Sequence, residues 1–116
     1  MDKAYAYVPS AVNAQFEGYA RRCGMTSLSE LLKLLIKREL RLRRLPHAKD
    51  DSGVTRQQPI ADRKKITAHL SPDMAESFAS HIDGLGLSTS LAASLLVEGE
   101  LTERWLEAAI GWEPRQ

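Results

Sequence analysis

Residues 65–73 read Lys-Ile-Thr-Ala-His-Leu-Ser-Pro-Asp, and this short stretch decides the fold that the sequence predicts. Polar and apolar residues alternate from Lys65 to Leu70, which is the pattern of a strand with one buried face. Ser71 and Pro72 follow directly, and this pair is typical of a helix start because serine caps the first turn and proline fits it. The sequence therefore predicts a half-buried strand that leads straight into a helix.

Two helices are expected after this strand. Apolar residues recur at helical spacing, and their positions in the first helix are Met74, Phe78, Ile82 and Leu85. Gly86 is placed to end this helix, and Ser88 can cap the next one. The apolar face expected for the second helix, which extends towards the C-terminus, contains Leu91, Leu95, Leu101, Trp105 and Ala109.

The same order of features is present in the first part of the chain. At an offset of 62 residues, Val8 falls on Leu70, Phe16 on Phe78, Ala20 on Ile82 and Gly24 on Gly86. After the turn the offset is 61, and it aligns Ser27 with Ser88, Leu34 with Leu95 and Glu39 with Glu100. The elements expected here are a strand over 3–8, a helix over 11–23 and a second helix with Leu31, Leu35 and Leu40 on its apolar face. An internal repeat of this kind indicates one structural unit used twice.

The repeat divides the chain into three parts. Residues 1–44 form the first repeat, 45–63 a linker without periodicity, and 64–116 the second repeat with an extended C-terminal helix. One unit alone would leave its strand edge unpaired and its apolar faces exposed. We therefore expect strand 3–8 to pair antiparallel with strand 65–70 within one chain. The predicted fold is α+β and mostly α, a compact domain with a two-stranded antiparallel ribbon and four helices.

The order strand, Leu-Ser-Pro, helix, Gly-Leu, Ser-Thr-Ser, helix resembles the ribbon-helix-helix superfamily of Arc, MetJ and CopG. Residues 64–101 contain this pattern, and residues 3–40 contain it with Val8-Pro9 in place of Leu70-Ser71. Most of those proteins are homodimers of one unit. This sequence resembles instead the tandem members, such as TraY-like and T-DNA-transfer accessory proteins, in which one chain supplies both units. The resemblance implies an intramolecular pseudo-dimer of two ribbon-helix-helix repeats.

The resemblance also implies that the ribbon lies in the major groove of double-stranded DNA. The base-contacting side chains would be those that point outward on the two strands, namely Lys3, Tyr5, Tyr7, Lys65, Thr67 and His69. The start of each second helix would contact phosphates through Thr26, Ser27, Ser29, Ser88, Thr89 and Ser90, unless these residues are ordinary helix caps. The implied role is either a conjugative or T-DNA-type transfer accessory factor or a transcriptional regulator. For a transfer factor, the relaxosome or other transfer proteins would be further partners. Because the two strands differ, the recognised site would not be palindromic.

Charge is distributed unevenly along the chain, although its net value is only +1. Residues 1–44 contain nine Lys and Arg against four Asp and Glu, and residues 64–116 contain four against eight. A basic first part is expected of a protein that binds a polyanion, although solvated basic faces have the same composition. The alternative function is a protein-interaction module, antitoxin-like or a relaxase partner, in which the acidic second half binds a protein and DNA affinity is weak.

No pattern in the chain indicates an enzyme, and we expect neither a cofactor nor a metal. His47, His69 and His81 lack the spacing of metal ligands, and the lone Cys23 lies on an apolar helix face, where filler is the favoured interpretation. A run of arginines comprises Arg38, Arg41, Arg43 and Arg44. It has two open interpretations, namely contact with phosphates or stabilisation of a helix C-terminus. The chain has neither an apolar signal core at its start nor a long apolar segment. We therefore expect a cytoplasmic protein, without a membrane partner, that is monomeric in solution and can associate on DNA.

Overall fold

The computed structural model describes residues 2–45 and 62–109, which form an α+β structure that is mostly helical, as predicted. In chain order the elements are β1 (Asp2–Pro9), α1 (Ser10–Arg22), α2 (Leu28–Leu42), β2 (Arg63–Leu70), α3 (Pro72–Leu85), α4 (Thr89–Glu103) and α5 (Trp105–Ala109). Most of the expected linker 45–63 lies outside the described residues. Its last member, Arg63, already belongs to β2, so the strand begins two residues before the predicted one.

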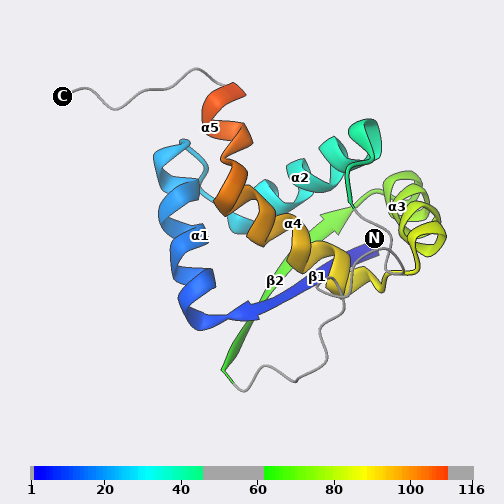
Figure 1. The fold of residues 1–116 in the computed structure, drawn as a ribbon, viewed down its shortest axis with the longest axis horizontal. Helices are drawn as coiled ribbons and strands as arrows, with labels where there is room; N and C mark the ends of the chain where they lie inside the picture. Colours follow the sequence, from blue (N-terminus) through cyan, green and yellow to red (C-terminus); the bar gives the residue numbers. More distant parts are fainter. Residues whose placement is uncertain (1, 46–61, 110–116) are drawn as a thin grey trace.

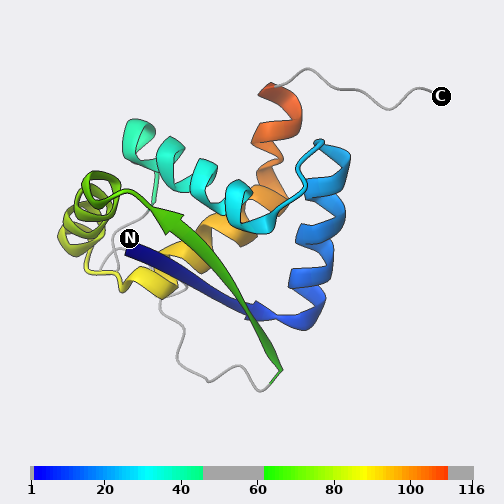
Figure 2. The same cartoon turned by 180° about the vertical axis from the view of Figure 1, so that it is seen from behind.

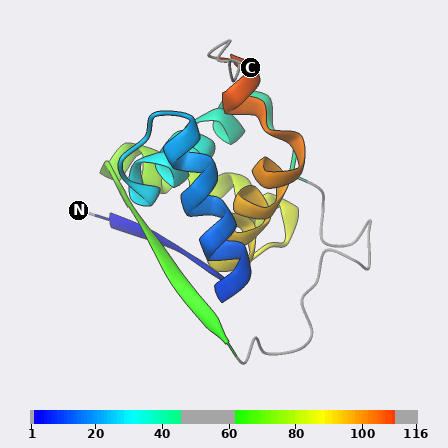
Figure 3. The same cartoon turned by 90° about the vertical axis from the view of Figure 1, so that its left-hand side faces the viewer.

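The two strands form a two-stranded antiparallel sheet, which confirms the expected pairing within one chain. Tyr5 pairs with Thr67 near the middle of this ribbon. The alternation of faces is also confirmed, because the inward side chains are all buried: Ala4, Ala6, Val8, Ile66, Ala68 and Leu70. The helices cover this inner face, so the ribbon lies along one side of the molecule (Figures 1 and 3).

Each long second helix packs over one strand of the ribbon, α2 over β2 and α4 over β1 (Figure 2). Serines on these helices also reach the backbone of the strands. Ser94 Oγ accepts a hydrogen bond from the Tyr7 N–H (3.1 Å) and lies 2.9 Å from the Tyr7 carbonyl oxygen. The Ser29 hydroxyl donates to the carbonyl of Thr67. In a two-stranded sheet every strand is an edge strand, so these serines give partners to backbone groups that no third strand can reach.

The face that α4 buries differs from the predicted one. Its buried residues are Ala92, Ala93, Ser94, Val97 and Glu100. The predicted Leu91, Leu95 and Leu101 pack only partly against the core, and Ala109 is exposed. The prediction failed because apolar residues lie on all sides of this helix, so their spacing selects no face. Small residues are buried instead, and one of them, Ser94, bonds the backbone of Tyr7 in β1.

The predicted extension of this helix is also interrupted. Arg104 adopts a left-handed conformation (φ 57°), which ends α4 and separates it from α5, so the described chain has five helices rather than the expected four. Arg43 ends α2 in the same conformation (φ 52°). Within the described residues, no helix combines the length and the apolar character that a membrane span requires.

Most helix starts and ends have the capping residues that the sequence predicted. Ser27, Ser71 and Ser88 cap α2, α3 and α4 by accepting a hydrogen bond from the backbone N–H three residues later. Gly24 and Gly86 follow the first helices with φ of +81° and +77°, a region that favours glycine. The start of α1 differs, because Pro9 occupies the cap position and no side chain caps the helix.

Candidate nucleic-acid interface

The outer face of the ribbon contains all six side chains that were predicted to contact bases. The cross-strand pairs are Lys3 with His69, Tyr5 with Thr67, and Tyr7 with Lys65. Lys3, Lys65 and His69 are exposed, and the other three are half-buried. We name this surface, formed by Lys3, Tyr5, Tyr7, Lys65, Thr67 and His69, the ribbon face. Directly opposed residues in an antiparallel pair have Cβ atoms about 5 Å apart, so the ribbon face is one compact surface.

Basic side chains lie over both tyrosine rings of the ribbon face. The Lys65 ammonium is 4.9 Å from the centre of the Tyr5 ring, and the Arg63 guanidinium is 4.5 Å from the centre of the Tyr7 ring. The two rings are themselves 6.5 Å apart and inclined by 35°. These cation–π contacts restrain the tyrosines, which otherwise would be two bulky free side chains.

Two further basic residues belong to the ribbon, although they were not predicted to be part of the strand. Arg63 and Lys64 are exposed members of β2, opposite Pro9 and Val8, but the expected strand began at Lys65. The signal was present as three consecutive basic residues, 63–65. Three exposed basic residues, Arg63, Lys64 and Lys65, therefore lie at one end of the ribbon, and Lys3 lies towards the other end.

The six residues predicted to contact phosphates lie at the starts of α2 and α4, and they are not equivalent. Ser27 and Ser88 are helix caps, which is the ordinary reading of such residues, although a capping hydroxyl keeps its own proton to donate. Ser29 differs because its hydroxyl already donates to Thr67 in the ribbon. Thr26, Ser88 and Thr89 are exposed, whereas Ser27, Ser29 and Ser90 are half-buried. The first backbone amides of both helices have no partner inside their helix and favour an anion.

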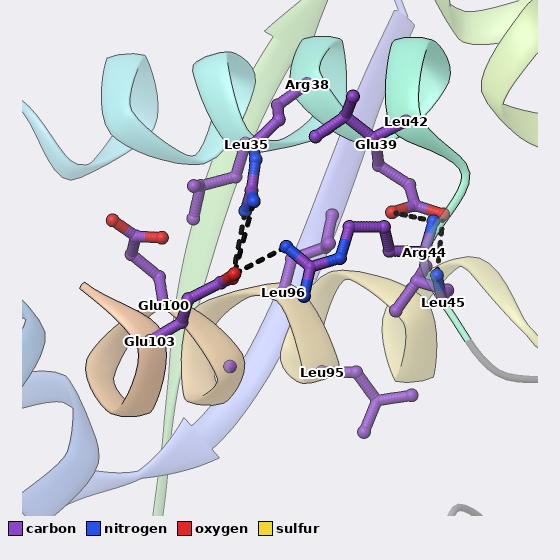
Figure 4. Close-up of a pocket in the computed structure, with 11 residues that line it drawn as sticks. Leu35, Arg38, Glu39, Leu42, Arg44, Leu45, Leu95, Leu96, Glu100 and Glu103 are labelled. Carbon is purple, nitrogen blue, oxygen red and sulfur yellow. Dashed lines mark hydrogen bonds and ion pairs between the residues drawn. The ribbon is translucent and has the colours of Figure 1, made fainter. Parts of the chain in front are cut away.

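The arginine run was predicted either to contact phosphates or to stabilise a helix C-terminus. Neither interpretation accounts for the whole run, because two of its members bind the other half of the chain. Arg38 donates to both carboxyl oxygens of Glu103 at 3.1 and 3.3 Å, and Arg44 donates to the same carboxyl group (Figure 4). Hydrogen bonds first from Arg38 and then from Arg44 lower the pKa of Glu103. The hollow that these residues border, between α2 and α4, has a volume of about 250 Å³ and walls of leucine. Arg41 is exposed in the last turn of α2, and Arg43 lies 3.0 Å from His81 Nδ1.

Two buried glutamates, which the repeat aligns but to which the sequence gave no role, join the halves of the chain. Glu39 Oε2 in α2 is 2.7 Å from His81 Nε2 in α3, and the Glu39 carboxyl group also accepts from the backbone of Arg44 and Leu45. Glu100 in α4 accepts from the Tyr19 hydroxyl in α1 at 2.5 Å and from the Leu106 N–H at 2.7 Å. An acidic residue at an apolar position of both second helices was the signal that could have revealed them.

Cys23 is partly buried beside the core, in keeping with the interpretation as filler. Burial, more than any neighbouring charge, raises the pKa of its thiol. A cysteine nucleophile requires a lowered pKa, because the thiolate is the reactive form. Its surroundings therefore do not activate it.

The chain matches no protein-family model, and searches of curated proteins and of solved structures found no significant similarity.

Proposed function

We propose that the chain is an intramolecular pseudo-dimer of two ribbon-helix-helix repeats that binds double-stranded DNA with its ribbon face. The observation that carries this proposal is the cross-strand register, which gathers the outward side chains of two distant segments on one exposed two-stranded ribbon. Such a ribbon fits the major groove of B-DNA, which is about 12 Å wide. No catalytic role is proposed.

Paired features of the two halves support the pseudo-dimer. Each second helix ends with an arginine in the left-handed conformation whose N–H donates to a glutamate carbonyl at 2.7 Å, Arg43 to Glu39 and Arg104 to Glu100. Each glutamate side chain then accepts from the backbone six residues further on, at Leu45 and Leu106. Each also contacts an aromatic ring on the first helix of the other half, and the two rings, His81 and Tyr19, align at the repeat offset of 62.

The chemistry of the ribbon face supports base contact. Lysine can donate to guanine, threonine can bond a base or touch a thymine methyl group, and histidine can donate or accept. Tyr5 and Tyr7 lie under the cations of Lys65 and Arg63, so both rings would enter the groove with positive charge beside them. Arg63 and Lys64 add charge that would attract phosphate.

The two strands of the ribbon face are chemically different, which supports a directional binding site. A homodimer presents the same side chains twice and favours palindromic half-sites. Here Lys3, Tyr5 and Tyr7 oppose His69, Thr67 and Lys65. A transfer accessory factor that marks one orientation at an origin of transfer needs such asymmetry, and a transcriptional regulator in the cytoplasm is the second role that we propose to test.

Selection of duplexes from a random-sequence DNA pool by the full chain tests this proposal. We expect an enriched, non-palindromic consensus whose affinity falls steeply with salt, because bound phosphates release counterions. On that consensus, Thr67→Ala should weaken binding by about 1–3 kcal/mol, the value of one base contact. The matched control is Thr102→Ala, an exposed threonine on α4, which should bind like the parent.

A second pair of variants tests the register on which the proposal depends. Thr67→Ala should change the free energy of unfolding by less than about 0.5 kcal/mol, as for most surface substitutions. Ile66→Asp should unfold the domain, because Ile66 is only 4 % exposed and the new charge would be buried without a partner. No enriched consensus, or a consensus that Thr67→Ala and Thr102→Ala bind equally, would refute DNA reading by the ribbon face. Salt-insensitive, weak DNA binding would favour the protein-interaction module instead.

A further inference from the structure

A second surface with a distinct chemistry lies on α2 and the start of α5. It is a groove of about 400 Å³, which we name the basic groove, lined by Leu34, Lys37, Arg38, Arg41, Leu42 and Trp105. The residues that α2 buries, among them Leu32 and Ile36, lie on another side of the helix, which faces the core under the ribbon. The basic groove is therefore separate from the ribbon face.

Leu42 is unusual among the described residues. Its exposed fraction is 48 %, and it is the one large hydrophobic side chain in the described part of the chain that is so exposed. Beside it lies Trp105, which is half-buried. The Arg38 guanidinium lies 4.5 Å from the centre of the Trp105 ring, and its two bonds to Glu103 hold it there. The groove thus has an apolar base and a wall whose position is restrained.

The rim of the basic groove is positively charged. Lys37 and Arg41 line the groove, and both are exposed. Lys33, which lies outside the lining, continues their one-turn spacing along α2, and the row is about 12 Å long at 1.5 Å per residue. None of the three has a carboxyl partner among the described residues. Like charges four residues apart on a helix are destabilising by a few tenths of a kcal/mol per pair. The lining itself contains no aspartate or glutamate.

We propose that the basic groove docks an acidic, amphipathic helical segment of another protein. An apolar side chain of that segment would cover Leu42 and Trp105, and carboxylates at one-turn spacing would face Lys37 and Arg41. A second copy of this chain fits poorly, because a symmetric contact would bring the same cations together. A non-symmetric contact would need another exposed apolar anchor, and the described residues offer none besides Leu42. This inference does not depend on DNA binding by the ribbon face.

Selection from a phage-displayed library of random peptides, about 14 residues long, on the immobilised full chain tests the proposal. The matched variants are Arg41→Glu and Arg21→Glu, which reverse an exposed arginine in the last turn of α2 and of α1 respectively. Leu42→Ala removes the apolar anchor at an exposed position and leaves the core intact. The affinity of the enriched peptides, made synthetically, is then measured by fluorescence anisotropy for each variant.

We expect enriched peptides that combine Asp or Glu with Leu, Phe or Trp, and whose affinity falls with salt. Arg41→Glu and Leu42→Ala should each weaken their binding by about tenfold or more, and Arg21→Glu by less than about twofold. Enriched peptides that are not acidic, or that bind Arg41→Glu and Arg21→Glu equally, would overturn the proposal. So would self-association that Leu42→Ala abolishes, or a loss of duplex DNA binding in Arg41→Glu as large as that in Thr67→Ala.

Discussion

Removal of the Tyr19 hydroxyl group tests the contact that joins α1 to α4 and α5. Tyr19 and Glu100 are 1 % and 2 % exposed, and the hydroxyl donates to Glu100 Oε2 at 2.5 Å. The same oxygen of Tyr19 accepts from the Glu107 N–H at 3.1 Å. Tyr19→Phe therefore removes two hydrogen bonds without changing the size of the ring, and it leaves a buried acceptor and a backbone donor with fewer partners.

The expected loss follows from these two bonds. A buried polar group that loses its partner costs about 1–3 kcal/mol, so Tyr19→Phe should lower the free energy of unfolding by about 2–3 kcal/mol. For a chain of this size 1 kcal/mol corresponds to about 4 °C in Tm, which gives a fall of roughly 8–12 °C. Urea and thermal unfolding followed by far-ultraviolet circular dichroism measure both values. Tyr5→Phe on the ribbon face is the matched control and should change stability by less than about 0.5 kcal/mol.

The pH dependence provides an independent readout of the same contact. Burial, and next the hydrogen bond to Glu100, raise the pKa of Tyr19 above its ordinary value of 10.0. Above that pH the unfolded chain releases the Tyr19 proton while the folded chain retains it. The parent should therefore lose stability as pH rises past about 10, by at most about 1.4 kcal/mol per pH unit from this residue. Tyr19→Phe lacks this contribution. If Tyr19→Phe is as stable as Tyr5→Phe and has the alkaline slope of the parent, the hydroxyl is solvated and the contact does not exist.

Three further predictions concern other parts of the chain. Gly99→Ala should raise the free energy of unfolding by about 0.5–1 kcal/mol, because a Cβ there meets no atom within 4 Å; Gly24→Ala should lower it, because φ is +81°. Urea titrations in which both changes have the same sign would contradict these backbone assignments. Because the pKa of Glu103 is lowered, this residue stabilises the fold fully above its ordinary pKa of 4.5, and that stabilisation is lost as the pH falls below 4.5. Glu103→Gln should therefore flatten the acid side of the plot of stability against pH at low salt. Identical plots for the variant and the parent would exclude the bonds from Arg38 and Arg44. Sedimentation at submicromolar concentration should give the 12.9 kDa monomer, whereas an obligate dimer would show that the strands pair between chains.

Both strands and most helix boundaries were predictable because their signals are local. Alternation over 65–70 defines which side of β2 is buried, whatever the strand packs against. Serine caps and positive-φ glycines act within one turn of backbone, so Ser27, Ser88 and the two glycines had the expected conformations. For the same reason the sequence predicted which side chains form the ribbon face. Their role in DNA binding remains a prediction.

The chain by itself determined both strands, the four long helices, the repeat and the two sides of each strand, since each depends on residues close in sequence. The break at Arg104 that separates α5 from α4 was not predicted. Only the tertiary structure decided which face α4 buries, because the apolar residues surround the whole helix and no spacing in the sequence singles out Ala92, Ala93 and Ser94. It also decided that Ser29 bonds the ribbon rather than standing free for a phosphate, and that Glu39 and Glu100 reach rings on the other half. These contacts join residues 38 to 81 positions apart, and no local periodicity records such pairings.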